Sequence, residues 1–437
     1  MSRLLIPFIL LLSSALTAFA QHAPVAFVDV NAIPMVDDAV QENWTVLVEG
    51  DRITAAGPSE EVDVPTDALQ IDASGQYLIP GLAEMHGHLP SVDEPRQYIE
   101  DLLFLFVSEG VTTVRGLQGS PGQLELKDEA NSGSIDSPSV YLAGPAFSGG
   151  SISSPEQAAS RVSEQVAEGW DFLKVLPGLT REEYDAMANR ANEEGIPFIG
   201  HVPSDVGLAH ALEMEQQTID HLDGYIAYLN GADRTLGDED MVEVIEMTLE
   251  SDVWLIPTMA LWETILGVPS VDEVSAYSEL RYMPKETRDS WVESHTQRRS
   301  SGNFDQQRAD LEAENRIRLL GALSDAGARI IMGTDAPQQF SVPGFSLRRE
   351  LPLMVEAGMT PYEILVTGTR SVGEYLSDKD TFGTIEPDGR ADLILLNENP
   401  LEDVMHVFDR AGVMVQGRWL DAEEIDARLQ EIEQRNR

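Results

Sequence analysis

Residues 79–89 of the chain read IPGLAEMHGHL, an apolar run that ends in two histidines, His86 and His88. The apolar residues are typical of a buried β-strand, and side chains two residues apart on a strand face the same side. Both imidazoles can therefore reach one metal ion from the end of a strand. A single pair of this kind is weak evidence for a metal site. Further potential ligands at the ends of other predicted strands are needed to support one.

The middle of the chain, residues 81–380, alternates strand-like runs with helical segments. After the strand that ends near His86, the runs lie at 111–115, 139–143, 171–176, 197–202, 218–222, 254–259 and 329–333, and helical segments include 154–168, 181–194 and 311–326. Eight β/α units predict a (β/α)8 barrel of the TIM type, which carries its active site at the C-terminal ends of the strands. A doubly wound open sheet is the alternative, but no GxGxxG loop follows an early strand.

The two ends of the chain are rich in short strands separated by Gly and Pro turns. Residues 21–80 and 381–437 are each too short to fold alone, so we expect them to form one small β-sandwich domain together. Apolar residues at helical spacing predict a terminal helix within 421–437. Residues 260–327 are the longest connection in the barrel region, and we expect four large side chains in it to cap the barrel mouth: Trp262, Tyr282, Met283 and Trp291.

The first twenty residues read MSRLLIPFILLLSSALTAFA. A basic start, a short apolar run and an A-x-A end predict a signal peptide over residues 1–20, with cleavage before Gln21. The alternative is a retained N-terminal anchor. We expect a secreted or periplasmic protein without stable membrane insertion after cleavage, because no other stretch approaches the length of a membrane span.

The composition narrows the classes of partner. The chain has 29 basic and 75 acidic residues, a formal net charge of −46, and no cysteine. This charge argues against nucleic acids and anionic membranes as partners. The partner that we expect, on the family resemblance described below, is a small-molecule substrate. Disulfides and thiol catalysis are excluded. The sequence does not indicate an oligomeric state.

Four more polar residues stand at the ends of predicted strands: Lys174, His201, His221 and Asp335. Each has an ordinary explanation when taken alone, such as a structural histidine, a lysine paired with an acid, or a turn carboxylate. Lys174 is the most unusual, because it is one of only four lysines and ends an apolar strand. A buried ammonium is costly unless it is paired or chemically altered. Six potential ligands at five strand ends of one barrel together predict a metal site.

This constellation resembles the amidohydrolase superfamily of metal-dependent hydrolases, especially the imidazolonepropionase-related branch that includes binuclear dipeptidases. The resemblance covers nearly all of residues 21–437. It rests on the HxH motif with its lead-in and on three further motifs: 110–115 (GVTTVR), 333–337 (GTDAP) and 383–393 (GTIEPDGRADL).

The resemblance implies a role for each of the six positions. His86 and His88 would hold a more buried metal ion, and His201 and His221 a more exposed one. Lys174, carrying a CO2-derived carbamate, would bridge both ions. Asp335 would bind the buried ion and transfer protons. Imidazolonepropionases proper lack the bridging lysine, so Lys174 argues against that reaction.

The implied activity is hydrolysis of an amide C–N bond by a hydroxide that bridges two divalent metal ions. Zinc is the first choice for such ligands, with manganese or cobalt as alternatives. A dipeptide or N-acyl amino acid is the expected substrate. A lactone, ester or organophosphate is the main rival, and a metal-holding binding protein without turnover is a remote alternative. Arg115, Tyr225, Tyr228 and Arg348 lie near strand ends or in the loops that follow them, and they are weak candidates for substrate contacts.

Overall fold

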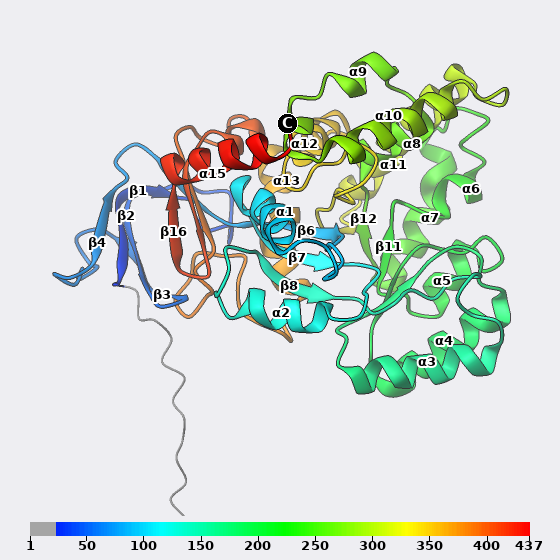
Figure 1. Cartoon of the computed structure of the whole chain (residues 1–437), viewed down its shortest axis with the longest axis horizontal. Helices are drawn as coiled ribbons and strands as arrows, with labels where there is room; N and C mark the ends of the chain where they lie inside the picture. The colour runs from blue at the N-terminus through cyan, green and yellow to red at the C-terminus, as the bar shows by residue number, and fades with distance from the viewer. Residues whose placement is uncertain (1–22) are drawn as a thin grey trace, which may run out of the picture.

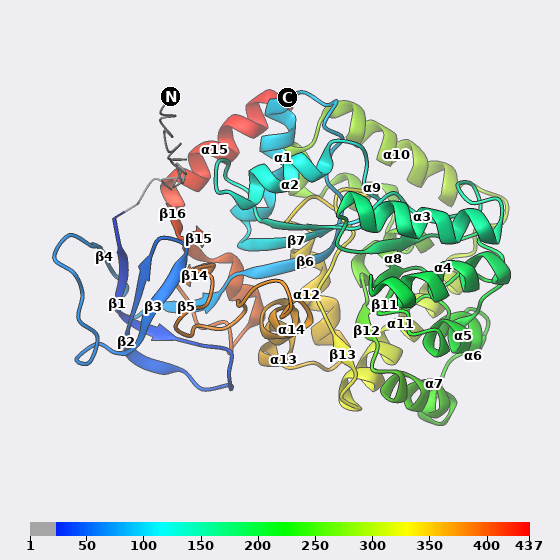
Figure 2. The same ribbon diagram turned by 90° about the horizontal axis from the view of Figure 1, so that it is seen from below.

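The computed structural model describes residues 23–437 and is shown in Figure 1. The predicted signal peptide, residues 1–20, lies outside the described residues. A mixed sheet lies to one side of the parallel strands in both Figure 1 and Figure 2. Within residues 23–437, no helix combines the length and the apolar character that crossing a bilayer requires.

Strands from both ends of the chain form the mixed sheet. Its strands are β1 (Val25–Ala32), β2 (Gln41–Glu49), β3 (Arg52–Pro58), β4 (Leu69–Asp72), β5 (Tyr77–Pro80), β14 (Leu393–Leu396), β15 (Arg410–Val415) and β16 (Arg418–Asp421). They pair in the order β16-β15-β14-β5-β1-β2-β3, with β4 beside β1. The pairing of β5 with both β1 and β14 joins the two chain ends.

The expected sandwich of two separate sheets is therefore replaced by one continuous sheet. This sheet folds over its own core, because the rings of Phe27 on β1 and Trp419 on β16 are 5.1 Å apart although three strands separate β1 from β16. The terminal helix, α15 (Ala422–Arg435), lies beside α1 (Arg96–Ser108) in both views. An ion pair of 2.8 Å between Arg435 and Asp101 joins the two helices.

Eight parallel strands form two further sheets. The first contains β6 (Leu82–Gly87), β7 (Val111–Gly116) and β8 (Ser139–Leu142). The second contains β9 (Leu173–Val175), β10 (Phe198–Gly200), β11 (Thr218–Asp220), β12 (Trp254–Ile256) and β13 (Arg329–Ile330). Each lies within or beside a run predicted from the sequence.

Contacts link these two sheets at both edges. Isolated parallel bridges pair Ala143 with Phe172 and Phe147 with Val175, between the β8 and β9 sides. At the other edge, the amide of Met85 donates to the carbonyl of Met332 at 2.9 Å. Strands on both sides of each gap therefore run next to one another.

Helices follow most of the parallel strands. They are α2 (Gln123–Asn131), α3 (Pro155–Glu168), α4 (Arg181–Glu194), α5 (Leu208–Glu213), α6 (Tyr225–Leu229), α7 (Asp238–Ser251), α8 (Met259–Leu266), α9 (Val271–Ser275), η1 (Ser278–Tyr282), α10 (Lys285–Arg299), α11 (Gln306–Asp325), α12 (Leu347–Glu356), α13 (Pro361–Gly368), α14 (Arg370–Tyr375) and η2 (Val404–Phe408). Local sequence sets several boundaries. For example, Thr180 and Glu183 form a capping box at the start of α4, and Gly195 ends that helix in the left-handed conformation.

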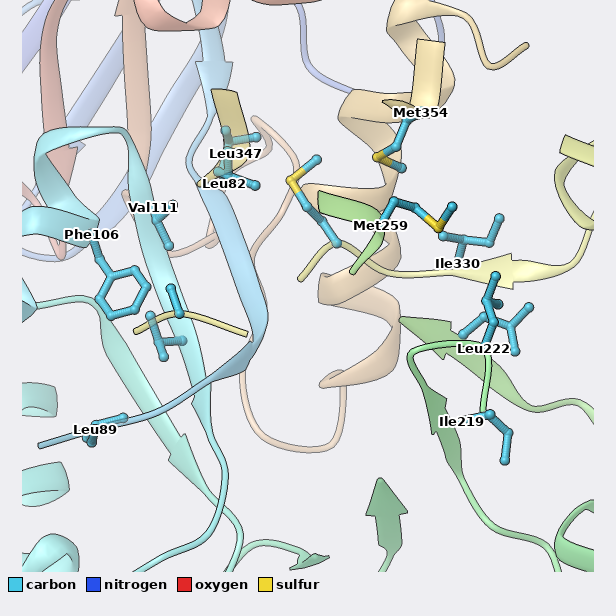
Figure 3. Close-up of a cluster of buried hydrophobic side chains, with 14 of the residues drawn as sticks. Leu82, Leu89, Phe106, Val111, Ile219, Leu222, Met259, Ile330, Leu347 and Met354 are labelled. Atoms are coloured by element: carbon cyan, nitrogen blue, oxygen red, sulfur yellow. The ribbon is translucent and has the colours of Figure 1, made fainter. Parts of the chain in front are cut away.

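The largest apolar core lies between the parallel strands and these helices. Figure 3 shows side chains from β6, β7, α1, β11, α8 and α12 packed in it, including Leu82, Phe106, Ile219 and Met354. Because this core holds the strands in place, polar side chains at the strand ends have fixed positions.

Candidate active site

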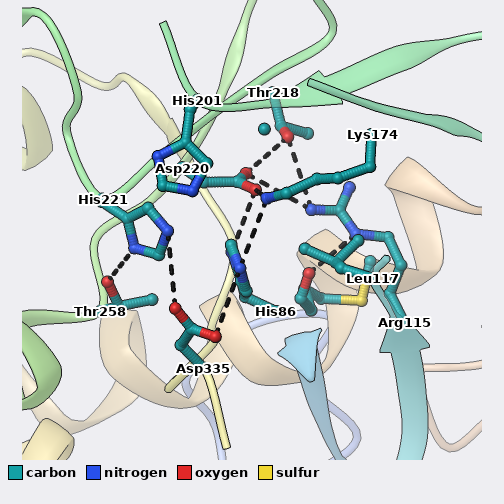
Figure 4. Close-up of polar contacts among 12 residues, drawn as sticks. His86, Arg115, Leu117, Lys174, His201, Thr218, Asp220, His221, Thr258 and Asp335 are labelled. Atoms are coloured by element: carbon teal, nitrogen blue, oxygen red, sulfur yellow. Dashed lines mark hydrogen bonds and ion pairs between the residues drawn. The ribbon is translucent and has the colours of Figure 1, made fainter. Parts of the chain in front are cut away.

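The structure brings all six predicted ligands to one end of the parallel strands, as Figure 4 shows for five of them. Asp335 Oδ1 lies 2.6 Å from His88 Nε2 and 3.5 Å from His86 Nε2. Its other oxygen, Oδ2, lies 3.6 Å from His221 Nε2. One ligand atom each from His86, His88 and Asp335 lie within 4.8 Å of one another, so these three residues could hold a metal ion.

His201 and His221 form the second side of the cluster. The ring of His221 lies 4.4 Å from that of His86 and 4.7 Å from that of His201, measured between centroids. His201 Nδ1 contacts Asp223 Oδ2 at 2.6 Å, and His221 Nδ1 contacts Thr258 Oγ1 at 2.7 Å. A metal-binding histidine commonly uses one ring nitrogen for the metal and the other for such a partner. Among residues 23–437, Nε2 of neither ring makes a hydrogen bond, so each Nε2 can face a cation.

Lys174 lies at the bottom of the cluster and is fully buried. Its Nζ donates to Asp220 Oδ2 at 2.9 Å and lies 3.5 Å from His86 Nε2. Gly200, the residue before His201, makes room for the lysine chain, because a Cβ there would lie 2.9 Å from Lys174 Cδ and 2.5 Å from the Val175 carbonyl. Lys174 therefore sits beside a predicted ligand of the buried ion.

The electrostatics of the cluster favour cation binding. Burial lowers the pKa of His86 to about 4 and that of His221 well below its ordinary value. Burial alone would raise the pKa of Asp335, but the neighbouring His86 and His88 hold it far below its usual range. Neutral imidazoles and an ionised carboxylate are the forms that bind metals.

Asp220 and Arg115 form a buried layer under the ligands. Arg115 Nη2 lies 3.6 Å from Asp220 Oδ1, and both side chains are fully buried. Burial opposes ionisation of Asp220, but Lys174, His86 and Arg115 hold its pKa well below the usual range. Asp220 was not among the residues predicted from the sequence, although a charged residue within an apolar strand was a signal for it.

Glu84 was also overlooked. It is buried on β6, and its Oε1 accepts hydrogen bonds from the amides of His86 at 2.9 Å and Thr334 at 2.8 Å. Glu84 thus ties the strand that carries His86 to the segment that carries Asp335.

The weak candidates for substrate contacts lie elsewhere. Arg115 is buried and donates to the Met85 carbonyl and the Tyr375 hydroxyl. Tyr225 is buried against Thr248, whereas Tyr228 is exposed and bonded to Glu243. Arg348 pairs with Glu109. None of the four candidates lines the pocket described next.

The cluster opens into a pocket of about 170 Å³. Besides the five ligands other than Lys174, its walls are Gln118, Leu261, Trp262, Ile265 and Gln338. Of the four large side chains expected over the barrel mouth, Trp262 alone lines this pocket. Tyr282 packs on Phe345 and Trp291 on Phe340.

The donor set fits divalent cations. The nitrogen and carboxylate ligands converge from separate strand ends. Nδ1 of His86 lies 3.0 Å from Asp220 Oδ2, which turns its other ring nitrogen, Nε2, toward Asp335. Such N/O sets suit zinc and similar ions.

Comparison with known proteins agrees with this geometry. A sequence profile described as the Amidohydrolase family matches residues 77–420. The solved structure of bottromycin amidohydrolase has a TM-score of 0.74 at 22% identity, over 94% of this chain and 90% of that one. A Xaa-Pro dipeptidase with bound methionine has a TM-score of 0.69 at 20% identity, over 92% and 100%. Such likeness supports the fold, a TIM-type barrel with a sheet domain.

Matches to curated relatives are shorter. An enamidase of Eubacterium barkeri is 31% identical over 164 residues, 36% of each chain. A dihydroorotase of Mycobacterium leprae is 45% identical over 62 residues, 14% of this chain and 13% of the relative. The chain therefore aligns with about a third or less of the length of these relatives.

Proposed function

This chain belongs to the Amidohydrolase family, and from that premise we propose that it is a binuclear metal-dependent hydrolase of dipeptides or N-acyl amino acids. The observation that carries the proposal is the convergence of six candidate ligand side chains from five strand ends, five of which line one pocket. The links at both edges of the parallel sheets support a closed (β/α)8 barrel as its framework. The dipeptidase among the structural neighbours makes a dipeptide the first substrate class to test.

Two cations, with zinc as first choice, would be held by His86, His88 and Asp335 on one side and by His201 and His221 on the other, with a carbamate on Lys174 between them. When bound, such ions supply a hydroxide nucleophile near neutral pH and polarise the scissile carbonyl.

Asp335 is the residue placed to move a proton. Its Oδ1 contacts His88 Nε2 at 2.6 Å, whereas the ion-pair partner of Oδ2 among the described residues is His221 Nε2, at the longer distance of 3.6 Å. Oδ2 would take a proton from the attacking water and deliver it to the leaving amine nitrogen. A carboxylate held ionised by its neighbours is a competent base at neutral pH.

Apolar walls serve to exclude bulk water. Leu261, Trp262 and Ile265, all on α8, line the pocket together with the candidate ligands. Exclusion of water strengthens the electrostatic stabilisation of the oxyanion that forms on attack.

Residues 1–20 support secretion or a periplasmic location for this activity.

The test is amine release from a panel of dipeptides and N-acyl amino acids. The enzyme would be the chain from Gln21 onward, supplied with zinc and bicarbonate, and Asp335→Asn would be the matched control. Turnover by the wild type and not by the control supports an amidohydrolase. Hydrolysis confined to lactones, esters or organophosphates would replace the substrate class. If no substrate of any class is hydrolysed, the result would favour a binding protein without turnover.

A further inference from the structure

A second cavity adjoins the metal pocket. It has a volume of about 500 Å³ and is lined by residues of α8, α10, α11 and the loop between α10 and α11, among them Leu266, Arg298, Phe304 and Arg308. Ile265 lines both this cavity and the metal pocket. The two hollows are therefore neighbours across a single side chain of α8.

Arg298 is the notable side chain in this cavity. Its Nη1 donates to the Thr264 carbonyl at 3.1 Å and to Gln339 Oε1 at 3.4 Å. Among the described residues, its Nε and Nη2 make no hydrogen bond, and no carboxylate lies within ion-pair distance of it. Partial burial lowers the pKa of Arg298, and no acid offsets this effect. Nη1 thus fixes the position of the guanidinium, and Nε and Nη2 can still donate hydrogen bonds to a ligand.

The other charged side chains of the cavity are already engaged. Arg308 pairs with Asp233 at 3.3 Å, and Glu312 pairs with Arg316 at 3.3 Å. Asp305 accepts the amides of residues 307 and 308 and so caps α11. The chain has 75 acidic residues, yet no described carboxylate pairs with the half-buried Arg298. Arg298 can therefore bind an anion from outside the protein.

Arg298 contacts two residues, and each of them is next in the sequence to a residue that lines the metal pocket. Thr264, which accepts its Nη1, precedes Ile265, and Gln339 follows Gln338, which also lines the metal pocket. An extended peptide advances about 3.3–3.6 Å per residue, so a group one residue from the scissile amide would lie beside the metal pocket, where the neighbouring hollow begins.

We propose that Arg298 binds the carboxylate of the substrate and so selects amides of amino acids that carry a free carboxylate. This inference rests on the proposed function. A guanidinium suits the role because its planar donors match the two oxygens of a carboxylate. A local cation is also needed to attract the substrate, because the net charge of −46 makes the chain repel anions.

The experiment compares a dipeptide with its C-terminal primary amide, using zinc-loaded wild type, Arg298→Gln and Arg298→Lys. We expect Arg298→Gln to raise KM for the free acid by roughly 10- to 100-fold, as loss of a charged hydrogen bond does, and to leave kcat and the KM for the amide nearly unchanged. Arg298→Lys should restore part of the loss, because it keeps the charge without the planar fork.

Arg308→Gln is the matched control, because Arg308 faces the same cavity but is committed to Asp233. It should change KM for neither substrate. Metal content and urea unfolding would establish that each variant is folded and loaded. Equal effects of Arg298→Gln on acid and amide, or no effect on the acid, would overturn the role of Arg298 while turnover of the dipeptide upheld the proposed function. If the wild type cleaves neither compound, both proposals fall.

Discussion

Arg316 gives the sharpest test of how the site is held in shape. It lies on α11, is 4% exposed, and donates from Nη1 to the carbonyl of His221 at 2.7 Å. Its guanidinium also lies 3.8 Å from the ring centroid of Trp262, which lines the metal pocket. His221 and Leu222 have φ angles of 64° and 52°, in the left-handed region that non-glycine residues seldom adopt. Arg316 therefore stabilises a strained turn that aims a candidate ligand.

The substitution Arg316→Met removes the charged donor and keeps an apolar side chain of similar reach. The buried carbonyl of His221 loses its donor, which costs about 1–3 kcal/mol. Loss of the desolvated cation–π contact costs about 2 kcal/mol more, of which a methionine on the same ring returns about 0.3–1.5. We expect the free energy of unfolding to fall by about 2–4 kcal/mol, in line with loss of a buried network. Affinity for the more exposed metal should fall as well, because His221 is released.

Urea unfolding of metal-free protein measures the first effect, and calorimetric titration with zinc measures the second. Arg318→Met is the matched control, since Arg318 is exposed on the same helix and should change stability by less than about 0.5 kcal/mol. A change below this limit for Arg316→Met, together with unaltered zinc affinity, would refute the reasoning that Arg316 supports His221.

Four further predictions concern single side chains. Asp335→Asn should lower kcat by about 100- to 10,000-fold while most of the metal remains bound, as elemental analysis would measure; surviving activity would exclude Asp335 as proton shuttle. Lys174→Ala should lose at least one metal per chain, and retention of two metals with full activity would contradict a bridging role. Asp223→Ala should weaken zinc binding by about 10- to 100-fold, because His201 loses the partner that orients it at 2.6 Å; an unchanged titration would count against this. Burial raises the pKa of Glu350 from 4.5 to about 7, so its contribution to stability is complete below pH 4.5 and is lost as the pH rises through 7. Between pH 4.5 and 7, the free energy of unfolding of the wild type, measured with urea, should fall by about 3 kcal/mol relative to that of Glu350→Gln. A difference between the two proteins that does not change with pH would exclude the raised pKa.

The sequence predicted the strands because each is an apolar run bounded by turns. The run at 197–202 contains β10 (Phe198–Gly200), and the run at 254–259 contains β12 (Trp254–Ile256). Ligand candidates followed from the rule that functional residues stand where such runs end. This rule needs only local information, which is why it found residues from distant parts of the chain.

The rule fails where the backbone departs from a regular strand. Adjacent residues of a strand face opposite sides, so placing His221 toward the site implies that Asp220 faces away. The left-handed conformation of His221 breaks this alternation, and both side chains reach the cluster. Asp223 and Arg316 depend instead on how a loop and α11 pack over the strand ends, and no local pattern in the sequence encodes that packing.

The charges under the site link the proposed modification of Lys174 to metal binding. In the structure, the ammonium of Lys174 and the guanidinium of Arg115 balance the carboxylates of Asp220 and Asp335. A carbamate on Lys174 would turn this neutral group into one with a formal charge of minus two, with two anions where an ion pair of 2.9 Å now lies. Burial makes such a surplus unfavourable unless cations offset it. The modification should therefore accumulate only together with divalent ions. Arg115, fixed by Met85 and Tyr375, would remain beside Asp220 if Lys174 carried the carbamate, as would His86, whose Nδ1 lies 3.0 Å from Asp220 Oδ2.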